Sequence, residues 1–180
     1  MFDTIAYGLK DISDDGKLPI IAEDLGLITD DVIAMREEFG LPGMKILQFG
    51  FSRPDNPFLP HLYPQNCVAY TGTHDNDTAR SWFETAPEKE REFALRYLNI
   101  ESCEDSELSQ GFVWSLIRAI WSSVAMFAIA PMQDVLDLGG GARMNFPSKL
   151  GGNWEWRMKE DDMNEALTAR LRELNYVYMR

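Results

Sequence analysis

The segment from Cys67 to Thr78 reads CVAYTGTHDNDT, and it joins two parts of opposite character. Its first four residues are apolar and predict a short buried strand. Of the eight residues that follow, seven carry polar side chains. The small residues among them allow a ligand to come close to the backbone, and His, Asp and Asn offer the donors and acceptors that sugar hydroxyls need. The segment therefore predicts a strand with a polar binding loop at its carboxyl end.

Further apolar runs on both sides of this segment predict three more strands, at residues 18–22, 44–49 and 126–130. Helical spacing predicts helices at about 29–40, 111–124 and 162–174, and a Thr85/Glu88 capping box predicts the start of another. Strands that alternate with helices favour parallel βα units. The sequence thus predicts an α/β fold for residues 1–180, as one partial domain.

Polar residues follow every predicted strand. They are Glu23-Asp24, Gln48, His74-Asp75 and Gln133-Asp134. In (β/α)₈ barrels the active site is built in this way, at the carboxyl ends of the strands. Four strands supply about half of such a barrel, and an open four-stranded parallel sheet is the alternative. Half of a barrel exposes one sheet face and two open edges, so we expect it either to associate with the missing half or to self-associate.

The composition excludes several classes of protein. The 180 residues are 45% hydrophobic, enough for a packed core, and carry a formal net charge of −12, which argues against nucleic acid as a partner. No apolar run is long enough to span a membrane, and the first nine residues lack the features of a signal peptide. Cys67 and Cys103 form no disulfide or zinc pattern, which favours a reducing, cytoplasmic location. With His61 and His74 as the only histidines, we expect neither a transition metal nor another cofactor.

Glu23 is the first candidate catalytic residue. Side chains alternate between faces where a strand ends, so only one of Glu23 and Asp24 can point into a site, and we choose Glu23. A Glu surrounded by apolar neighbours has a pKa that burial can raise until it serves as a proton donor at neutral pH. Solvated loop acids or helix caps are the structural alternative for this pair.

The loop after the third predicted strand holds Asp75, with His74 and Asn76 on either side. Asp75, Asn76 and Asp77 also suggest a calcium loop, but position 86 is Ala, where the twelve-residue calcium loop needs a Glu. Further along, Asn153 and Trp154 lie in the stretch GNWEWR, from Gly152 to Arg157. Trp154 and Trp156 are two residues apart and would share one face of an extended segment, where they could stack on sugars.

Taken together, these motifs resemble the glycoside hydrolase family 77 enzymes, the amylomaltases or disproportionating enzymes. The resemblance covers nearly the whole chain, and its segments occur in family order. They are IIAEDLG (20–26), FGLPGMKILQF (39–49), NPFLPH (56–61), YTGTHDNDT (70–78), RMN (143–145) and GNWEWR (152–157). The stretch Pro147-Ser148-Lys149 departs from the Pro-Gly-Thr of many members.

The resemblance implies a barrel of the α-amylase clan, with the present chain as its C-terminal half, about strands 5–8. It implies a 4-α-glucanotransferase of glycogen and starch metabolism, acting on α-1,4-glucans and maltooligosaccharides. Glu23 matches the acid/base residue and Asp75 the transition-state stabiliser. His74 matches a sugar-contacting histidine, and Asn76, Asn153 and Trp154 are expected to bind substrate.

A retaining transferase also needs a carboxylate nucleophile, about 5 to 5.5 Å from the acid/base group. The aspartate motif that provides it in the family is absent here, so we expect the isolated chain to be inactive. Two other functions remain open. One is a glucan-binding module without catalysis, and the other is an amylase-clan hydrolase in which water replaces the sugar acceptor.

Overall fold

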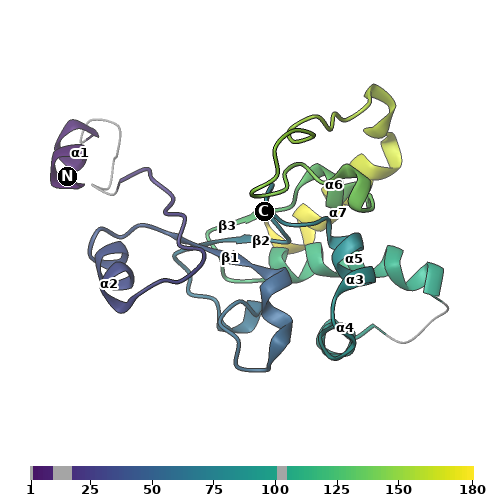
Figure 1. Cartoon of the computed structure of the whole chain (residues 1–180), viewed down its shortest axis with the longest axis horizontal. Helices are drawn as coiled ribbons and strands as arrows, with labels where there is room; N and C mark the ends of the chain where they lie inside the picture. Colours follow the sequence, from purple (N-terminus) through teal and green to yellow (C-terminus); the bar gives the residue numbers. More distant parts are fainter. Residues whose placement is uncertain (1, 10–17, 101–104) are drawn as a thin grey trace.

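The computed structural model describes residues 2–9, 18–100 and 105–180 (Figure 1). Cys103 lies outside the described residues. The helices are α1 Phe2–Leu9, α2 Asp30–Glu38, α3 Ala79–Thr85, α4 Glu88–Tyr97, α5 Asp105–Trp121, α6 Met132–Val135 and α7 Glu165–Tyr178. Four 3₁₀ turns, at Leu47–Ser52, Pro60–Leu62, Gly140–Ala142 and Glu160–Asp162, complete the helical segments of the described part.

Three strands form a parallel sheet in the order β1-β2-β3, where β1 is Gly43–Ile46, β2 is Cys67–Tyr70 and β3 is Phe127–Ile129. Val68 of β2 pairs with Met44 on one side and with Phe127 on the other, so the carboxyl ends of all three strands lie at one edge. The predicted parallel βα arrangement is confirmed, and the predicted strand at 67–70 has the observed bounds.

The predicted strand at 18–22 is wrong. In the described structure this segment makes one backbone hydrogen bond toward β1, from the Ala22 N–H to the Pro42 carbonyl at 2.9 Å, which is not enough for a ladder. Pro19 lacks an N–H group and cannot add a bond. The sheet of the described residues therefore has three strands and not four.

Other boundaries also differ from the prediction, including the start of α5 at Asp105 instead of 111. The strand predicted at 44–49 ends at Ile46, and Leu47–Ser52 forms a 3₁₀ helix that turns Leu47 and Phe51 into the core. A short apolar run does not distinguish a strand from a buried helical turn. The Thr85/Glu88 capping box is wrong, because Thr85 is the last residue of α3 and its hydroxyl donates to the Ser81 carbonyl.

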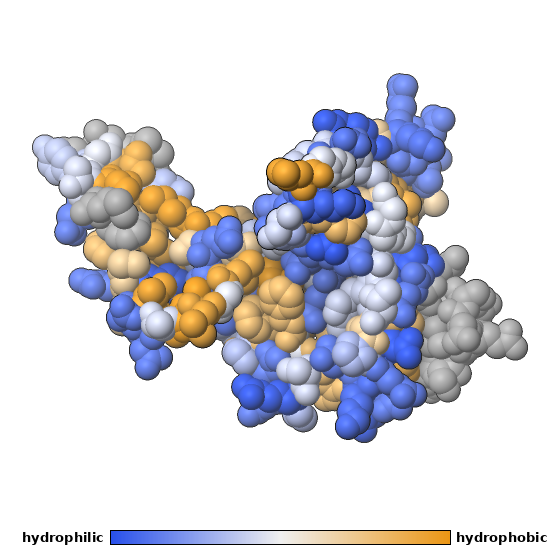
Figure 2. All heavy atoms as spheres, in the orientation of Figure 1, coloured by the Kyte–Doolittle hydropathy of each residue, from blue (hydrophilic) through white to orange (hydrophobic). Residues whose placement is uncertain are grey.

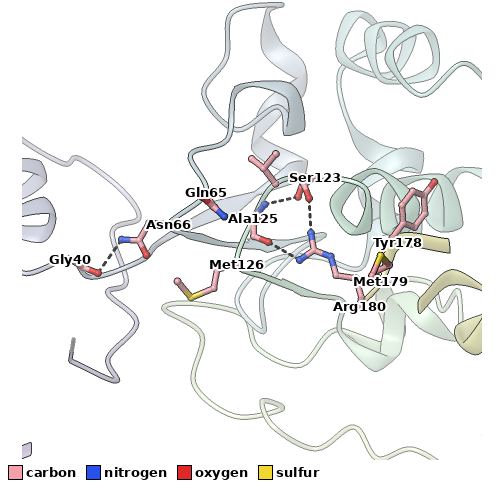
Figure 3. Close-up of a pocket in the computed structure, with 10 residues that line it drawn as sticks. Gly40, Gln65, Asn66, Ser123, Ala125, Met126, Tyr178, Met179 and Arg180 are labelled. Atoms are coloured by element: carbon pink, nitrogen blue, oxygen red, sulfur yellow. Dashed lines mark hydrogen bonds between the residues drawn. The ribbon is translucent and has the colours of Figure 1, made fainter. Parts of the chain in front are cut away.

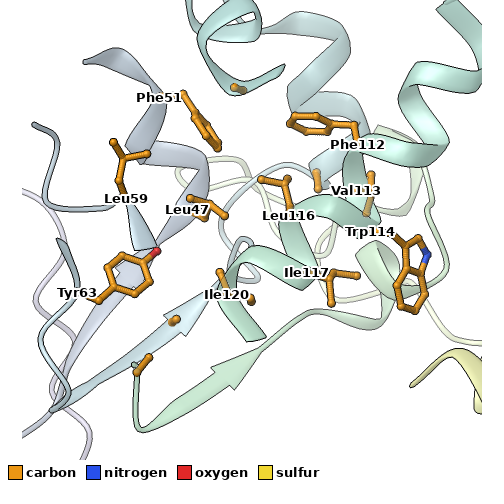
Figure 4. Packing of buried hydrophobic residues seen from close by; sticks show 14 of the residues in the cluster. Leu47, Phe51, Leu59, Tyr63, Phe112, Val113, Trp114, Leu116, Ile117 and Ile120 are labelled. Carbon is orange, nitrogen blue, oxygen red and sulfur yellow. The ribbon is translucent and has the colours of Figure 1, made fainter. Parts of the chain in front are cut away.

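The core lies between the sheet and the helices, and α5 contributes more of its large side chains than any other element (Figure 4). Cys67 and Ala69 of β2 face this layer and are fully buried. Each large apolar side chain buried here stabilises the fold by roughly 1.5–3 kcal/mol. The fully buried members from α5 are Phe112, Val113, Leu116, Ile117 and Ile120.

The other face of the sheet is only partly covered. Register places Phe127 and Ile129 on this face, beside Val68 and Tyr70, and their side chains are 52% and 41% exposed. In the view of Figure 1, α3, α5 and α7 lie to the right of the strands and α2 to the left. Figure 2 shows hydrophobic surface at the centre of the molecule, between these two parts. The partly covered face thus presents an apolar surface next to the carboxyl ends of the strands.

Candidate functional site at the carboxyl ends of the strands

A cleft of about 660 Å³ opens on the partly covered face, at the carboxyl edge of the sheet. Its apolar lining includes side chains from all three strands, Met44, Tyr70 and Ile129. Its polar lining includes Glu23, His74, Asp75 and Asn76. The structure therefore brings together four of the six predicted site residues, although 52 positions in the sequence separate Glu23 from Asp75.

Glu23 and Asp24 have separate surroundings. Glu23 lines the cleft and is exposed. The Asp24 carboxylate accepts a hydrogen bond from Arg36 Nη1 at 2.5 Å and another from the Met44 N–H at 2.6 Å, which fastens the segment to α2 and β1. The burial expected for Glu23 is therefore not provided by the described residues.

Asp75 lies at the rim of the cleft with its side chain half exposed. Asn145 Nδ2 donates to its Oδ1 at 2.5 Å, and Arg143 Nη2 donates to its backbone carbonyl at 2.7 Å. His74 Nε2 lies 3.5 Å from the same Oδ1. Among the described residues none donates to Oδ2, which leaves this oxygen able to accept a hydrogen bond from a ligand.

The His74 ring packs against the Trp154 ring, with centroids 4.9 Å apart and a 39° angle between the planes. Trp154 has φ of 64°, a left-handed conformation that costs a residue with a side chain roughly 1–2 kcal/mol. The backbone N–H of Trp154 donates to the Met144 carbonyl at 2.7 Å, and this bond together with the ring contact holds Trp154 in that conformation. Because the backbone is not extended at Trp154, the expected shared face with Trp156 is wrong.

Trp154 also lines a smaller pocket of about 220 Å³, which shares His74 and Asn76 with the cleft. Asn76 uses its side-chain oxygen within the loop, where the N–H and hydroxyl of Thr73 both donate to it at 2.8 Å. Asn153 lines neither hollow. Its oxygen accepts from the Phe146 N–H and its amide donates to the Lys149 carbonyl, so in the structure it closes its own loop. Substrate binding by Asn153 stays a prediction.

Arg143 and Asn145 are site residues that the sequence analysis did not assign a role. They lie 68 and 70 positions after Asp75, and no periodicity links them to it. In the sequence they stand out only through the segment RMN, which follows the last strand and is one of the segments that resemble the family. Asp134 is a third such residue. Its fully buried carboxylate accepts from the Thr71 hydroxyl at 2.5 Å and from the Ala79 N–H at 2.7 Å.

The calcium-loop alternative does not fit the observed contacts. Both carboxylate oxygens of Asp77 accept protein hydrogen bonds, from the Thr78 N–H and from the Ser81 hydroxyl. The oxygen of Asn76 is likewise occupied by Thr73. Within residues 2–9, 18–100 and 105–180, no three His, Cys, Asp or Glu side chains cluster as metal ligands would.

A third hollow, of about 730 Å³, lies at the opposite, amino-terminal edge of the sheet (Figure 3). Its polar groups bond to one another. Asn66 donates to the Gly40 carbonyl, and the Arg180 guanidinium donates to the carbonyls of Trp121, Ser123 and Ala125. These contacts tie the end of α7 to the chain before β3, which is a structural role. The candidate site is therefore the cleft at the carboxyl edge.

A parallel sheet with helices on one face and a polar cleft at its carboxyl edge defines the class of α/β proteins that bind ligands where their strands end. Within the described residues no helix has the length and apolar character of a membrane span.

Comparison with known proteins narrows this class. Residues 1–164 match the family model described as 4-alpha-glucanotransferase, glycoside hydrolase family 77. Curated relatives include the 4-alpha-glucanotransferases of Clostridium butyricum (46% identity, covering 92% of this chain and 33% of the relative) and Thermus thermophilus (48%, 88% and 32%). The chain belongs to glycoside hydrolase family 77, and it spans about a third of the length of these relatives.

A solved structure agrees with this result. The amylomaltase from Streptococcus agalactiae in complex with acarbose superposes with a TM-score of 0.83 at 35% sequence identity. The match covers 97% of this chain and 34% of the amylomaltase chain. The observed backbone arrangement is therefore also present, in nearly its entirety, within a longer member of the family.

Proposed function

We propose that this chain forms part of the catalytic domain of a 4-α-glucanotransferase, which transfers α-1,4-glucan segments between maltodextrins. The main support for this proposal is the cleft that brings Glu23 together with His74, Asp75 and Asn76 at the carboxyl edge of a parallel sheet. Family membership and the acarbose complex of the S. agalactiae relative support α-1,4-glucans as the ligand class.

In this proposal Glu23 is the acid/base residue. It protonates the leaving 4-oxygen of the donor glucan and later takes the proton from the acceptor hydroxyl. Asp75 accepts hydrogen bonds from the 2- and 3-hydroxyls of the distorted sugar, with Asn145 fixing its carboxylate orientation. His74 contacts the same sugar, and Trp154 supports the His74 ring. A carboxylate from outside these 180 residues serves as nucleophile, so the chain alone is inactive.

We also propose that the sheet is the C-terminal half of a (β/α)₈ barrel. Helices cover one face, as in the outer layer of a barrel, and the opposite face exposes Phe127 and Ile129. In a closed barrel such inward side chains fill the interior. A cytoplasmic location remains a prediction, since the relatives include bacterial proteins and a chloroplastic/amyloplastic protein of Arabidopsis thaliana.

Incubation of a longer protein, one that joins these residues to the rest of the barrel, with maltotriose tests the function. We expect glucose together with maltodextrins longer than maltotriose, because the glycosyl-enzyme is attacked by a sugar hydroxyl. The products are separated by chromatography. Glucose and maltose without longer products would identify a hydrolase, and unchanged maltotriose that still binds the protein would identify a binding module.

The exposed sheet face predicts self-association of the 180-residue chain. Burying Phe127 and Ile129 against a second copy removes apolar surface from water, so light scattering should report a dimer or a larger species. Replacing both residues by Lys should restore the monomer. Tyr176→Lys is the control, since Tyr176 is 82% exposed on α7. A monodisperse wild-type monomer would contradict the prediction.

A further inference from the structure

Asp134 connects two elements that the sequence separates widely. It lies in α6, directly after β3, and its side chain is 2% exposed. Oδ2 accepts from the hydroxyl of Thr71, the first residue after β2, and Oδ1 accepts from the N–H of Ala79, the first residue of α3. The loop 71–78, which carries His74 and Asp75, runs between these two points. One carboxylate therefore closes this loop at both ends.

Both donors need an acceptor at this position. Thr71 and Ala79 are fully buried, so water does not replace a lost partner at either group. The Ala79 N–H belongs to the first turn of α3, where no helical carbonyl is available to it. A carboxylate offers two acceptor oxygens on one carbon, which matches two donors that converge from different elements.

Burying a carboxylate at this site is costly. Burial is the main cause that raises the pKa of Asp134 from 3.8 to about 6; the nearby carboxylates of Asp137 and Asp77 act in the same direction, and the two hydrogen bonds oppose it. The site also faces the small pocket lined by His74, Trp154 and Arg143. The presence of a buried carboxylate here is therefore explained by the loop that it holds and not by packing.

The remaining contacts of the loop act at its middle and its end. Asn145 and Arg143 hold Asp75 from the segment after β3. Gln48 donates to the Asp77 carbonyl at 3.0 Å, and a Cβ at Gly72 would come within 2.7 Å of the same Gln48 nitrogen. Asp134 thus holds the two ends of the loop 71–78 together, while these other contacts orient the residues in its middle.

We propose that Asp134 is a positioning residue of the transferase, whose carboxylate closes the loop 71–78 and so fixes His74 and Asp75 at the cleft. The claim rests on the proposed function only for the roles of His74 and Asp75. The closure itself is a property of this chain, and it can be measured without catalysis.

Hydrogen exchange of the 180-residue chain at neutral pH measures the closure directly. In Asp134→Ala, loss of both acceptors should accelerate amide exchange in the peptide 71–79 by about tenfold or more, as expected when buried hydrogen bonds open locally. Val135→Ala is the matched control, because it removes buried side-chain volume from the adjacent residue of α6, which lines neither the cleft nor the small pocket. It should leave the exchange of this peptide, relative to the rest of the chain, as in the wild type.

Asp134→Asn tests whether closure of the loop needs the negative charge of residue 134 or only its hydrogen bonds. The Asn oxygen can accept from the Ala79 N–H while its amide donates to the Thr71 hydroxyl, so exchange in the loop should return most of the way to the wild-type rate. Equal acceleration in Asp134→Ala and Val135→Ala, or no acceleration in Asp134→Ala, would overturn the proposal.

Activity is then compared in the longer protein. Asp134→Ala should lower kcat for maltotriose about tenfold or more, with partial recovery in Asp134→Asn, while Val135→Ala should retain the wild-type kcat below its unfolding temperature. Transfer activity that is abolished by Glu23→Gln but unchanged in Asp134→Ala would refute the positioning role alone. A longer protein without transfer activity would refute the proposed function, and the exchange result would still decide whether Asp134 closes the loop.

Discussion

Replacing Glu23 by Gln in the longer protein is expected to lower kcat/KM for maltotriose by about 10²–10⁴-fold, the range that general acid–base catalysis contributes. Gln has nearly the shape of Glu but can neither donate a proton to the leaving 4-oxygen nor take one from the acceptor. Binding of an unreactive maltooligosaccharide should change little, because Glu23 lies at one side of a cleft with several other polar groups. Steady-state kinetics and calorimetry measure the two effects separately.

Glu38→Gln is the matched control for this experiment. The chemical change is the same, and Glu38 is an exposed residue at the end of α2 that does not line the cleft. It should keep the wild-type rate. A Glu23→Gln variant as active as this control would show that the acid/base group lies elsewhere.

The stability of the 180-residue chain should depend on pH through Asp134. Its pKa rises from 3.8 to about 6 on folding, chiefly because burial disfavours the charged carboxylate. The folded state therefore binds a proton that the unfolded state has lost, and stability from this group decreases as pH rises from about 4 to about 6. The full change is on the order of 3 kcal/mol.

Urea unfolding of wild type and Asp134→Asn across this pH range tests the linkage. Asn does not titrate, so the stability of the variant relative to wild type should increase by about 3 kcal/mol between acidic and neutral pH. Asp161→Asn, the same change at an exposed carboxyl, is the control. Parallel curves for wild type and Asp134→Asn would show that Asp134 does not titrate in this window.

Much of the fold could be predicted because its signals are local. The strand at 67–70 is a short apolar run bounded by polar residues, and α5 and α7 show helical spacing over several turns. Prediction failed where neighbours in space decide the backbone. The segment 18–22 is apolar but has too few hydrogen-bonding partners to be a strand, and Leu47 turns into the core instead of extending β1.

The same division holds for the site. Family resemblance selected Glu23, His74 and Asp75, and the structure lines one cleft with all three. The resemblance could not show that Glu23 is exposed, that Trp154 adopts a left-handed backbone, or that Asn153 uses its side chain within its own loop. These properties depend on what lies beside each residue.

The sequence by itself determined the family, the alternation of strands and helices, and the residues that can carry the chemistry, because these follow from local pattern and residue type. Only the tertiary structure decided which groups hold the loop 71–78. Asn145 meets Asp75 across 70 positions, and Asp134 meets Thr71 across 63. Parallel strands bring their carboxyl ends to one edge whatever the length of chain between them, so contacts made there leave no fixed spacing in the sequence.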